Sequence, residues 1–355
     1  MQNSIQTLAK ETGFDLVKFT SAQLNEPSFQ AYSSWVLKGR AAEMAYMSRD
    51  LPRRRSVESL LPGAKSVVCL AVNYYRLQRE SASPNQQGAV EPSGQVARYA
   101  YGRDYHKIIE KMLKRLVRTL REEYPQHEWK SYVDTGAVLE RSYSEQAGLG
   151  YIGKNTNLIT PELGSWVFLA EVLTTMELTG RSDGHETPTD SCGHCRLCLD
   201  ICPTGALVGE RELDARKCIS YLTIENRGPI PIELRPLIGD WIYGCDLCQE
   251  ICPKNVRAQA ISVEELVAKR IGGDFQLLGD ILQLRTDEQF NERFAGSAMR
   301  RAKREGLVRN ACVVVANVKA TSLVPLLNEV LENDASEMVR EHAEWALNQF
   351  KNEES

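Results

Sequence analysis

Ten cysteines, most of them in two short runs, constrain this chain more than any other feature. The first run is Cys192-Gly-His-Cys195-Arg-Leu-Cys198-Leu-Asp-Ile-Cys202-Pro203, and a partial echo follows at Cys245-Asp-Leu-Cys248-Gln-Glu-Ile-Cys252-Pro253. The spacing C-x2-C-x2-C-x3-C-P is that of bacterial [4Fe-4S] ligation, in which three close thiolates hold one cluster and the fourth holds another. The second run lacks its own first cysteine, and Cys218 lies between the runs to fill that role. The sequence therefore predicts two [4Fe-4S] clusters.

Crossing the fourth cysteines divides the thiolates evenly between the clusters. One cluster takes Cys192, Cys195, Cys198 and Cys252, and the other takes Cys202, Cys218, Cys245 and Cys248. Zinc ribbons are an alternative, but they usually pair CxxC motifs without a tight fourth cysteine before proline. Disulfides are a second alternative and need an oxidising compartment. Cys69 and Cys312 stand in apolar runs and are interpreted as small core residues.

The chain of 355 residues is long enough for two or three units with cores of their own. Its first part alternates helices and strands, which predicts an α+β or α/β domain with a substantial sheet. The continuous apolar run 67–72 indicates a strand buried on both faces, and apolar residues at three-to-four spacing over 104–123 predict an amphipathic helix. We expect this domain at 1–185, a ferredoxin-like two-cluster domain at 186–260 and a helical domain at 261–355.

The C-terminal part repeats itself. The segments 307–316 and 338–347 align on Val-Arg at 308–309 and 339–340, with a helix expected at 323–331 between them. This pattern favours a short HEAT-like helical repeat that stacks into a scaffold, and a plain helical bundle is the alternative.

A basic run begins just before this repeat. Its members are Arg293, Arg300, Arg301, Lys303, Arg304 and Arg309. A charge run is usually a solvated helix face, yet Glu305 is the acid interleaved among the last four cations. Because the net charge of the chain is −4, nucleic-acid binding would need such a local patch. The run therefore predicts phosphate contacts.

A carboxylate, Asp134, stands in Val133-Asp-Thr-Gly136 at the end of a predicted strand, and Glu140 and Arg141 follow on a helix. Loops at the carboxyl ends of strands hold ligands in α/β domains. An aspartate before glycine is also a common turn former, and that alternative stays open. The glycine-spaced segment 148–157 is not a phosphate-binding loop, because it lacks GxxxxGK[ST].

The N-terminus has no basic region followed by an apolar run, and no segment approaches the ~18 apolar residues of a membrane span. We therefore expect a cytoplasmic protein without a membrane partner. Nothing in the sequence demands more than a monomer.

Taken together, these motifs closely resemble those of the epoxyqueuosine reductase family, whose members catalyse the last step of queuosine formation in tRNA. The resemblance covers nearly the whole chain. Besides the cysteine runs it rests on Leu60–Val67, Gly102–His106, Val133–Gly136 with Glu140 and Arg141, Gly153–Asn155, Gly164–Glu171, Cys218–Thr223 and Tyr243–Asp246.

The resemblance implies a cobalamin in the N-terminal domain, two [4Fe-4S] clusters and an external electron donor. It implies a tRNA substrate that carries epoxyqueuosine in a GUN anticodon. By matching position, Asp134 is the proton donor. The corrinoid is expected to contact Arg54, Ala97, Arg98, Asp134, Arg141, Lys154, Asn155, Leu158, Leu169, Ser220 and Asp246. The tRNA is expected to contact Thr223, Arg300, Arg301, Lys303 and Arg304.

Chemistry agrees with the resemblance, because no side chain supplies electrons for removing an epoxide oxygen, whereas a corrinoid fed by two clusters does. As a hypothesis, electrons pass from the donor through the clusters to cobalt, and Asp134 protonates the departing oxygen. A carboxylate with a pKa of about 4 is a poor acid at neutral pH, so we expect burial against the corrin and the nucleobase to raise the pKa of Asp134.

Two other functions are weighed against this one. Corrinoid-dependent reductive dehalogenases share the pairing of a cobalamin domain with two clusters, but they are typically exported and do not explain the basic helical tail. A ferredoxin-like electron carrier explains the cysteines but leaves the N-terminal domain without a role.

Overall fold

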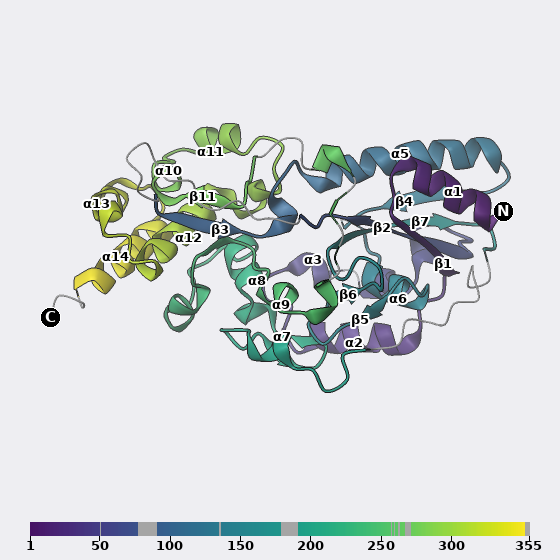
Figure 1. Ribbon diagram of the computed structural model, residues 1–355, viewed down its shortest axis with the longest axis horizontal. Coiled ribbons are helices and arrows are strands. Elements are labelled where there is room, and N and C mark those ends of the chain that lie inside the picture. The colour runs from purple at the N-terminus through teal and green to yellow at the C-terminus, as the bar shows by residue number, and fades with distance from the viewer. Residues whose placement is uncertain are drawn as a thin grey trace.

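The N-terminal part is built on an antiparallel sheet of four strands (Figure 1). The computed structural model describes residues 1–49, 51–76, 91–134, 136–178, 191–256, 258, 260–261, 263–266 and 271–351. The strand order is β1 (Leu16–Ser21), β2 (Ser66–Asn73), β7 (Val167–Thr174) and β4 (Trp129–Tyr132), and each neighbouring pair is antiparallel. The mixed helix and sheet content expected from the sequence is confirmed, in the antiparallel arrangement typical of α+β folds.

Strand β2 lies at the centre of this sheet and is buried along its whole length, as its apolar run predicted. Alternate side chains enter two cores, with Val68, Leu70 and Val72 on one face and Val67, Cys69 and Ala71 on the other. Helices α1 (Gln2–Thr12) and α5 (Tyr105–Glu123) cover the first face, and α6 (Glu140–Gln146) covers the second. The sheet therefore separates α5 from α6.

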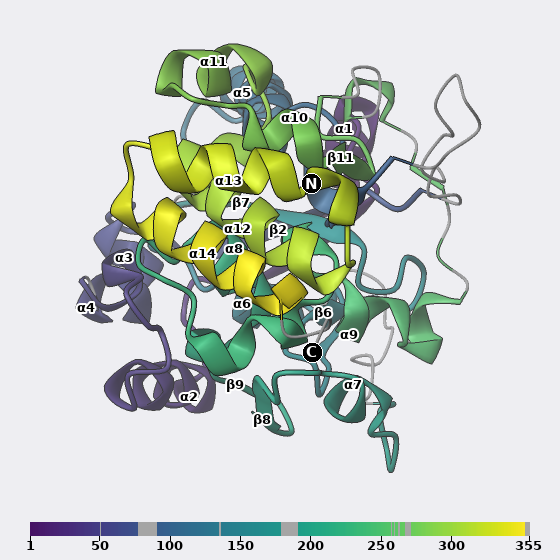
Figure 2. The same ribbon diagram turned by 90° about the vertical axis from the view of Figure 1, so that its left-hand side faces the viewer.

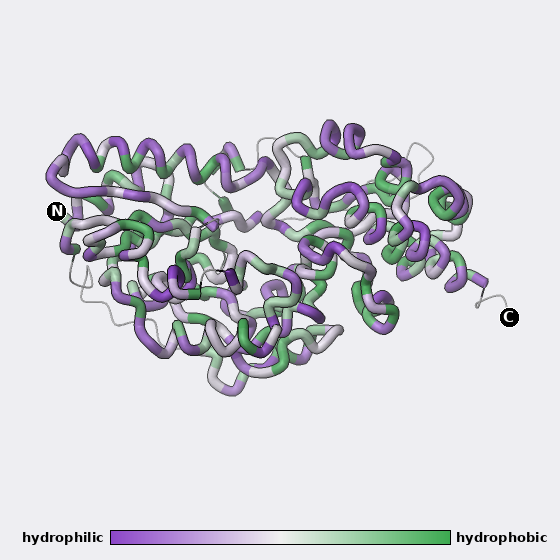
Figure 3. The backbone as a smooth tube through the Cα atoms, turned by 180° about the vertical axis from the view of Figure 1, so that it is seen from behind, coloured by the Kyte–Doolittle hydropathy of each residue, from purple (hydrophilic) through white to green (hydrophobic). Residues whose placement is uncertain are grey.

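Helix α5 begins at its N-cap Asp104, whose side chain accepts a hydrogen bond from the backbone N–H of His106 at 3.1 Å. The apolar stripe expected on this helix is confirmed. Its buried members are Ile108, Ile109, Met112, Leu113, Leu116, Val117 and Leu120. Figure 3 shows the alternation of hydrophilic and hydrophobic residues along the helix. This packing fixes the first turn of α5 at one end of the sheet.

Smaller elements surround the α6 face. They are α2 (Glu26–Leu37), α3 (Ala45–Ser48), α4 (Leu51–Arg55) and the hairpin of β5 (Tyr151–Ile152) and β6 (Leu158–Ile159). The cysteine segment adds α7 (Leu197–Asp200), α8 (Ile219–Ile224), α9 (Leu247–Glu250) and the hairpin of β8 (Leu207–Gly209) and β9 (Glu212–Leu213). Helices α7 and α9 pack against each other, which brings the two cysteine runs together.

A second sheet joins the three parts of the chain. Its strand β3 (Ser93–Val96) lies between β10 (Trp241–Tyr243), from the cysteine segment, and β11 (Phe275–Leu277), from the C-terminal part. Gly94 is required in β3, because a Cβ atom there would lie 2.7 Å from the Ile242 side chain. The expected boundary after 185 falls outside the described residues.

The C-terminal part is helical, as expected. Its helices are α10 (Leu278–Leu282), α11 (Asp287–Arg293), α12 (Lys303–Asn317), α13 (Val324–Asn333) and α14 (Glu337–Lys351). The two Val-Arg segments lie on α12 and α14, which pack against each other, and α13 packs on α14 (Figure 2). The expected intervening helix is therefore present. The interpretation of these helices as a HEAT-like repeat stays a prediction.

Candidate functional site

The cysteine thiols gather in the two predicted sets. Burial and then Cys252, Cys192 and Cys195 raise the pKa of the Cys198 thiol. In the other set, burial raises the pKa of Cys245 and Cys248, and among the thiols Cys218 makes the largest contribution to both increases. Cys202 in turn raises the pKa values of Cys218 and Cys248, and Cys198 also raises the pKa of Cys248. The two sets therefore lie next to each other.

The chemistry of the two donor sets fits iron–sulfur clusters, because each set consists of four cysteine thiols. Thiols whose pKa values are raised by burial and by one another need a cationic partner to ionise, and iron supplies it. Cys69 and Cys312 are fully buried in apolar cores, as expected.

Three of the residues expected to hold a cofactor join the sheet domain to the cysteine loops. The buried Lys154 donates from Nζ to the Gly193 carbonyl at 2.6 Å. Asn155 donates from Nδ2 to the Cys248 carbonyl at 3.1 Å, and Asp246 accepts from the Arg98 backbone N–H at 2.8 Å. These side chains anchor the loops on which the thiols lie.

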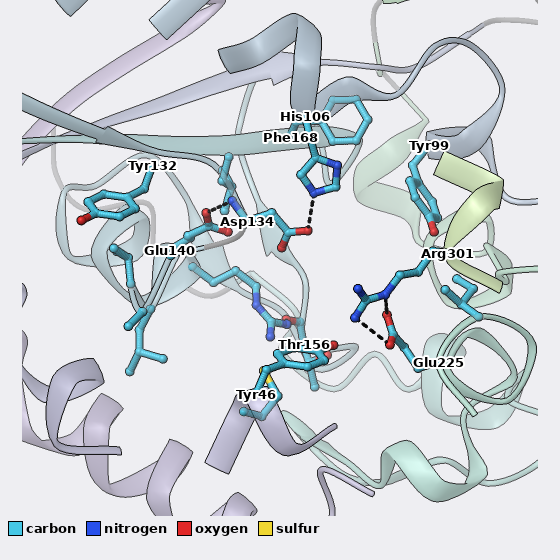
Figure 4. A pocket seen from close by; sticks show the side chains of 18 of the residues that line it. Tyr46, Tyr99, His106, Tyr132, Asp134, Glu140, Thr156, Phe168, Glu225 and Arg301 are labelled. Carbon is cyan, nitrogen blue, oxygen red and sulfur yellow. Dashed lines mark hydrogen bonds and ion pairs between the residues drawn. The ribbon is translucent and has the colours of Figure 1, made fainter. Parts of the chain in front are cut away.

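A cavity of about 2150 Å³ lies between the end of the sheet, α2 to α4, the β8–β9 hairpin and the C-terminal helices. Drug-sized ligands fill pockets of about 300–1,000 Å³, so this cavity has room for a larger molecule. Aromatic rings line part of it, among them Tyr46 and Phe168 (Figure 4). Tyr105 belongs to the same lining. Tyr105 stacks on Phe168 with ring centroids 4.1 Å apart.

The Asp134 side chain projects into this cavity from the loop after β4. Its Oδ2 accepts hydrogen bonds from the Tyr105 hydroxyl at 2.7 Å and contacts His106 Nε2 at 3.0 Å. The Asp134 backbone is left-handed, with φ of 52°, and its N–H donates to Glu140 Oε1 at 2.6 Å. Gly136 is needed in the loop, because a Cβ atom would lie 2.5 Å from the Tyr132 ring. The sequence therefore builds a defined carboxylate–imidazole pair.

The rise in the pKa of Asp134 expected from burial against the corrin and the nucleobase stays a prediction, because in the protein alone the pKa is lowered. Burial does raise the pKa, but hydrogen bonds from His106 and Tyr105 outweigh it and lower the pKa below its ordinary value. Burial lowers the pKa of His106, whereas hydrogen bonds with Asp104 and Asp134 raise it to about 9. At neutral pH the pair is therefore an aspartate and an imidazolium, and the proton resides on His106.

Replacing His106 by glutamine tests this proton assignment. Because the pKa of His106 is raised, His106 keeps its proton through neutral pH and loses it as the pH rises through about 9. We expect the single-turnover rate of the wild type to fall as the pH rises through about 9. His106→Gln should be slower at neutral pH and should lack this alkaline fall. The matched control is His127→Gln, at the turn beyond the far end of α5. An unchanged alkaline fall in His106→Gln would contradict the assignment.

The basic run divides into buried and exposed members. Arg304 is buried and forms a double hydrogen bond with Asp334 at 2.8 and 3.0 Å. Arg309 is buried as well, and donates to backbone carbonyls, including that of Leu222 at 2.6 Å. The expectation that Arg304 binds tRNA is therefore not supported, because Asp334 already neutralises it.

Three of the exposed members lie at the cavity, whereas Arg293, which is also exposed, pairs with Asp280 and does not line it. Arg300, Arg301 and Lys303 are exposed and line it. Arg301 holds Glu225 with contacts of 2.7 and 2.9 Å on the side of the cavity opposite Asp134 (Figure 4).

Thr223, also expected to contact tRNA, is fully buried. Its hydroxyl donates to the Ile219 carbonyl at 2.7 Å and accepts from the Gly244 N–H at 2.9 Å. The expectation is wrong, because no surface of Thr223 is free for a nucleic acid.

The residues expected to contact the cofactor also divide into those that line the cavity and those that do not. Arg54, Asp134, Arg141 and Leu169 line the cavity. Ala97 and Leu158 are buried beneath protein, and Ser220 lies on α8 outside the lining. Arg98 likewise lies outside it.

Sequence reasoning missed the roles of His106, Tyr105 and Glu225. The first two stand in the motif Gly102–His106, and the signal that could have found them is a helix N-cap, Asp104, followed directly by an aromatic residue and a histidine. Glu225 gave no signal, because its partner Arg301 is distant in the sequence.

Paired thiol sets beside a large cavity that holds a proton-carrying pair define an iron–sulfur oxidoreductase. Residues 191–255 match the 4Fe-4S double cluster binding domain, and residues 54–135 match epoxyqueuosine reductase QueG, DUF1730. The epoxyqueuosine reductase of Pseudomonas aeruginosa is 38% identical over 353 residues, which cover 98% of this chain and 94% of that protein.

Solved structures agree. A crystal structure of epoxyqueuosine reductase with a tRNA-Tyr epoxyqueuosine-modified stem loop matches with a TM-score of 0.87 and 31% identity, over 98% of this chain and 89% of the other. That of the Bacillus subtilis enzyme, with its catalytic loop swung out of the active site, has a TM-score of 0.86 and 30% identity, over 98% and 90%. The chain belongs to the epoxyqueuosine reductase family.

Proposed function

We propose that this chain reduces the epoxide of epoxyqueuosine at the wobble position of tRNA to the alkene of queuosine. The observation that carries the proposal is the Asp134–His106 pair, exposed in a cavity large enough for a cofactor and a nucleoside. Family membership supports it over the dehalogenase and electron-carrier alternatives. Removing the epoxide oxygen as water takes two electrons and two protons.

The residues around the cavity fit a cobalamin. Arg54 lines the cavity, and its buried Nε has no hydrogen-bond partner among the described residues, so a donor is available for a polar ligand. Leu169 and the aromatic rings offer apolar surface, and Arg141 adds a second cation. Arg54, Arg141 and Leu169 would hold the group. When bound, cobalamin supplies the electron chemistry that side chains lack.

The chain's own residues supply a proton. His106 holds it at Nε2, and Asp134 accepts that hydrogen bond at 3.0 Å while facing the cavity. We propose that the proton passes from His106 to Asp134 and that Asp134 delivers it to the departing oxygen. The thiol sets carry the clusters through which an external donor reduces the site, with Cys192, Cys195, Cys198 and Cys252 in one set and Cys202, Cys218, Cys245 and Cys248 in the other.

The exposed cations Arg300, Arg301 and Lys303 support tRNA as the substrate, because they gather where a nucleic acid would enter the cavity. Phosphate contacts would position the GUN anticodon loop, and the modified base would turn into the cavity. We propose that the C-terminal helices act as a HEAT-like scaffold for this surface. Among the described residues, no helix has the length and hydrophobicity of a membrane span. A cytoplasmic monomer remains our proposal.

Reversing two of these charges tests the tRNA surface. The double variant Arg300→Glu with Lys303→Glu should weaken binding on the order of tenfold to a hundredfold and flatten its salt dependence, because two phosphate contacts are lost. Arg301 is left intact so that its pairing with Glu225 is not disturbed. The control reverses Lys114 and Arg118, both exposed on α5. If the two double variants bound tRNA with equal titration midpoints, the assignment of this surface to tRNA binding would be contradicted.

The function itself is tested by product analysis. Protein loaded with iron, sulfide and cobalamin is incubated with a reductant and tRNA that carries epoxyqueuosine, and the nucleosides are analysed by mass spectrometry. We expect loss of one oxygen atom from the modified nucleoside. Unchanged nucleoside in the presence of intact clusters and bound cobalamin would refute the proposal.

A further inference from the structure

A buried carboxyl group, Glu171, lies behind the Asp134 loop and has no part in the function proposed above. It stands on β7, directly opposite Cys69 of β2, and is completely inaccessible to solvent. Neither of its oxygens has a nitrogen or hydroxyl partner within the described part of the chain. Burying a carboxylate without a hydrogen-bond partner destabilises a fold in general. Its persistence at the centre of the sheet therefore needs an explanation.

The group that faces Glu171 is a second carboxyl, that of Glu140 on α6. Two ionised carboxylates offer acceptors alone, so a hydrogen bond between them requires a proton on one of them. Glu140 Oε1 already accepts the Asp134 N–H at 2.6 Å and so acts as an acceptor toward the loop. The proton between the two carboxyl groups is therefore best placed on Glu171.

The surroundings of Glu171 agree with a neutral acid. The titratable groups that face it are Glu140 and Tyr143 on α6, Cys69 on β2 and Asp134 after β4, and none of them is a cation. Burial, followed by the charge of Glu140, raises the pKa of Glu171. The charge of Arg141 lowers the pKa of Glu140.

We propose that Glu171 is a positioning residue: as a neutral acid it donates a hydrogen bond to Glu140, and Glu140 holds the Asp134 backbone N–H, which keeps the Asp134 side chain in the cavity. The left-handed backbone of Asp134 makes such a hold necessary, because a residue other than glycine adopts this conformation at a cost. The family relative whose catalytic loop is swung out of the active site has a loop with an alternative position. The role in turnover rests on the proposed function.

Hydrogen exchange of the holoenzyme tests the proposal without any substrate. The readout is the Asp134 amide, followed by mass spectrometry of the peptide that contains the loop. Glu171→Met keeps the length of the side chain but has no donor, so the amide should exchange at least about tenfold faster. Glu171→Gln retains a donor to Glu140 and should exchange like the wild type. Should Glu171→Met not fold, Glu171→Leu makes the same comparison.

Two further variants separate positioning from a general loosening of the core. Cys69→Ala removes a buried neighbour of Glu171 on the same face and should leave the amide protected. Glu140→Leu should free the amide by itself, and adding Glu171→Met should accelerate exchange no further, because Glu171 acts through Glu140. Unchanged protection in Glu171→Met, equal exchange in the Met and Gln variants, or additive effects would each overturn the proposal.

Turnover links this result to the function. Glu171→Met should lower the single-turnover rate about tenfold, in step with exchange, and Glu171→Gln should restore it. If exchange responds as expected while the wild type reduces no epoxyqueuosine, the proposed function fails and the positioning role stands. If the wild type is active and exchange does not respond, the positioning role fails alone.

Discussion

Asp134→Asn is expected to lower the single-turnover rate about 10²–10⁴-fold, the range for loss of a general acid, while cluster content and cobalamin binding stay unchanged. Asparagine preserves the shape of the side chain and an acceptor for the Tyr105 hydroxyl. It cannot relay a proton, and it removes one of the two carboxylates that raise the pKa of His106. The variant should therefore lose the proton transfer while its fold stays intact.

The control for this variant is Asp280→Asn, which removes a half-buried aspartate that pairs with Arg293 at 3.0 Å. It changes the charge equally but lies outside the cavity lining. Rates are compared under saturating reductant, with cobalamin and iron measured on the same samples. A rate for Asp134→Asn within a few-fold of the control would remove Asp134 from the proton path.

Cys218→Ser should cost one cluster. Iron is expected to fall from about eight to about four atoms per chain, and turnover should be lost because electrons no longer reach the cavity. Among the ligands, Cys218 provides the most informative test, because its position in the sequence follows no spacing motif. Its thiol lies in the set with Cys202, Cys245 and Cys248.

Iron and sulfide analysis with electron paramagnetic resonance of the reduced protein measures this effect. Cys312→Ala is the control, because Cys312 is a fully buried core residue in α12 and should retain full iron content. If Cys218→Ser kept all its iron and an unaltered spectrum, a different fourth ligand would have to be sought.

Features that depend on local pattern could be predicted from the sequence. The apolar run 67–72 predicted a strand buried on two faces, and the stripe on α5 predicted its core face. Each follows from a period that one element imposes by itself. The spacing within each cysteine run predicted cluster ligands in the same way, whereas Cys218 follows no motif and its assignment stays a prediction. The helices around 307–316 and 338–347 followed in the same way.

Features that depend on partners distant in the sequence could not be predicted. The basic run looked free because few acids stand beside it, yet Asp334 neutralises Arg304 and Glu225 pairs with Arg301. The expectation for the pKa of Asp134 considered burial against the corrin and the nucleobase, and it did not include His106 and Tyr105, which α5 brings close and which lower the pKa in the protein alone. In both cases tertiary structure supplies a charge or donor that the local sequence does not contain.

Epoxyqueuosine reduction by this chain is measured most directly by comparing the nucleosides after one turnover. tRNA carrying epoxyqueuosine is mixed with cobalamin-loaded, reduced wild type, with Asp134→Asn and with Cys218→Ser, and each product is analysed by mass spectrometry. We predict that queuosine forms with the wild type alone. If the wild type left epoxyqueuosine unchanged, or if both variants produced queuosine as fast as the wild type, the proposed reduction through Asp134 and the Cys218 cluster would be refuted.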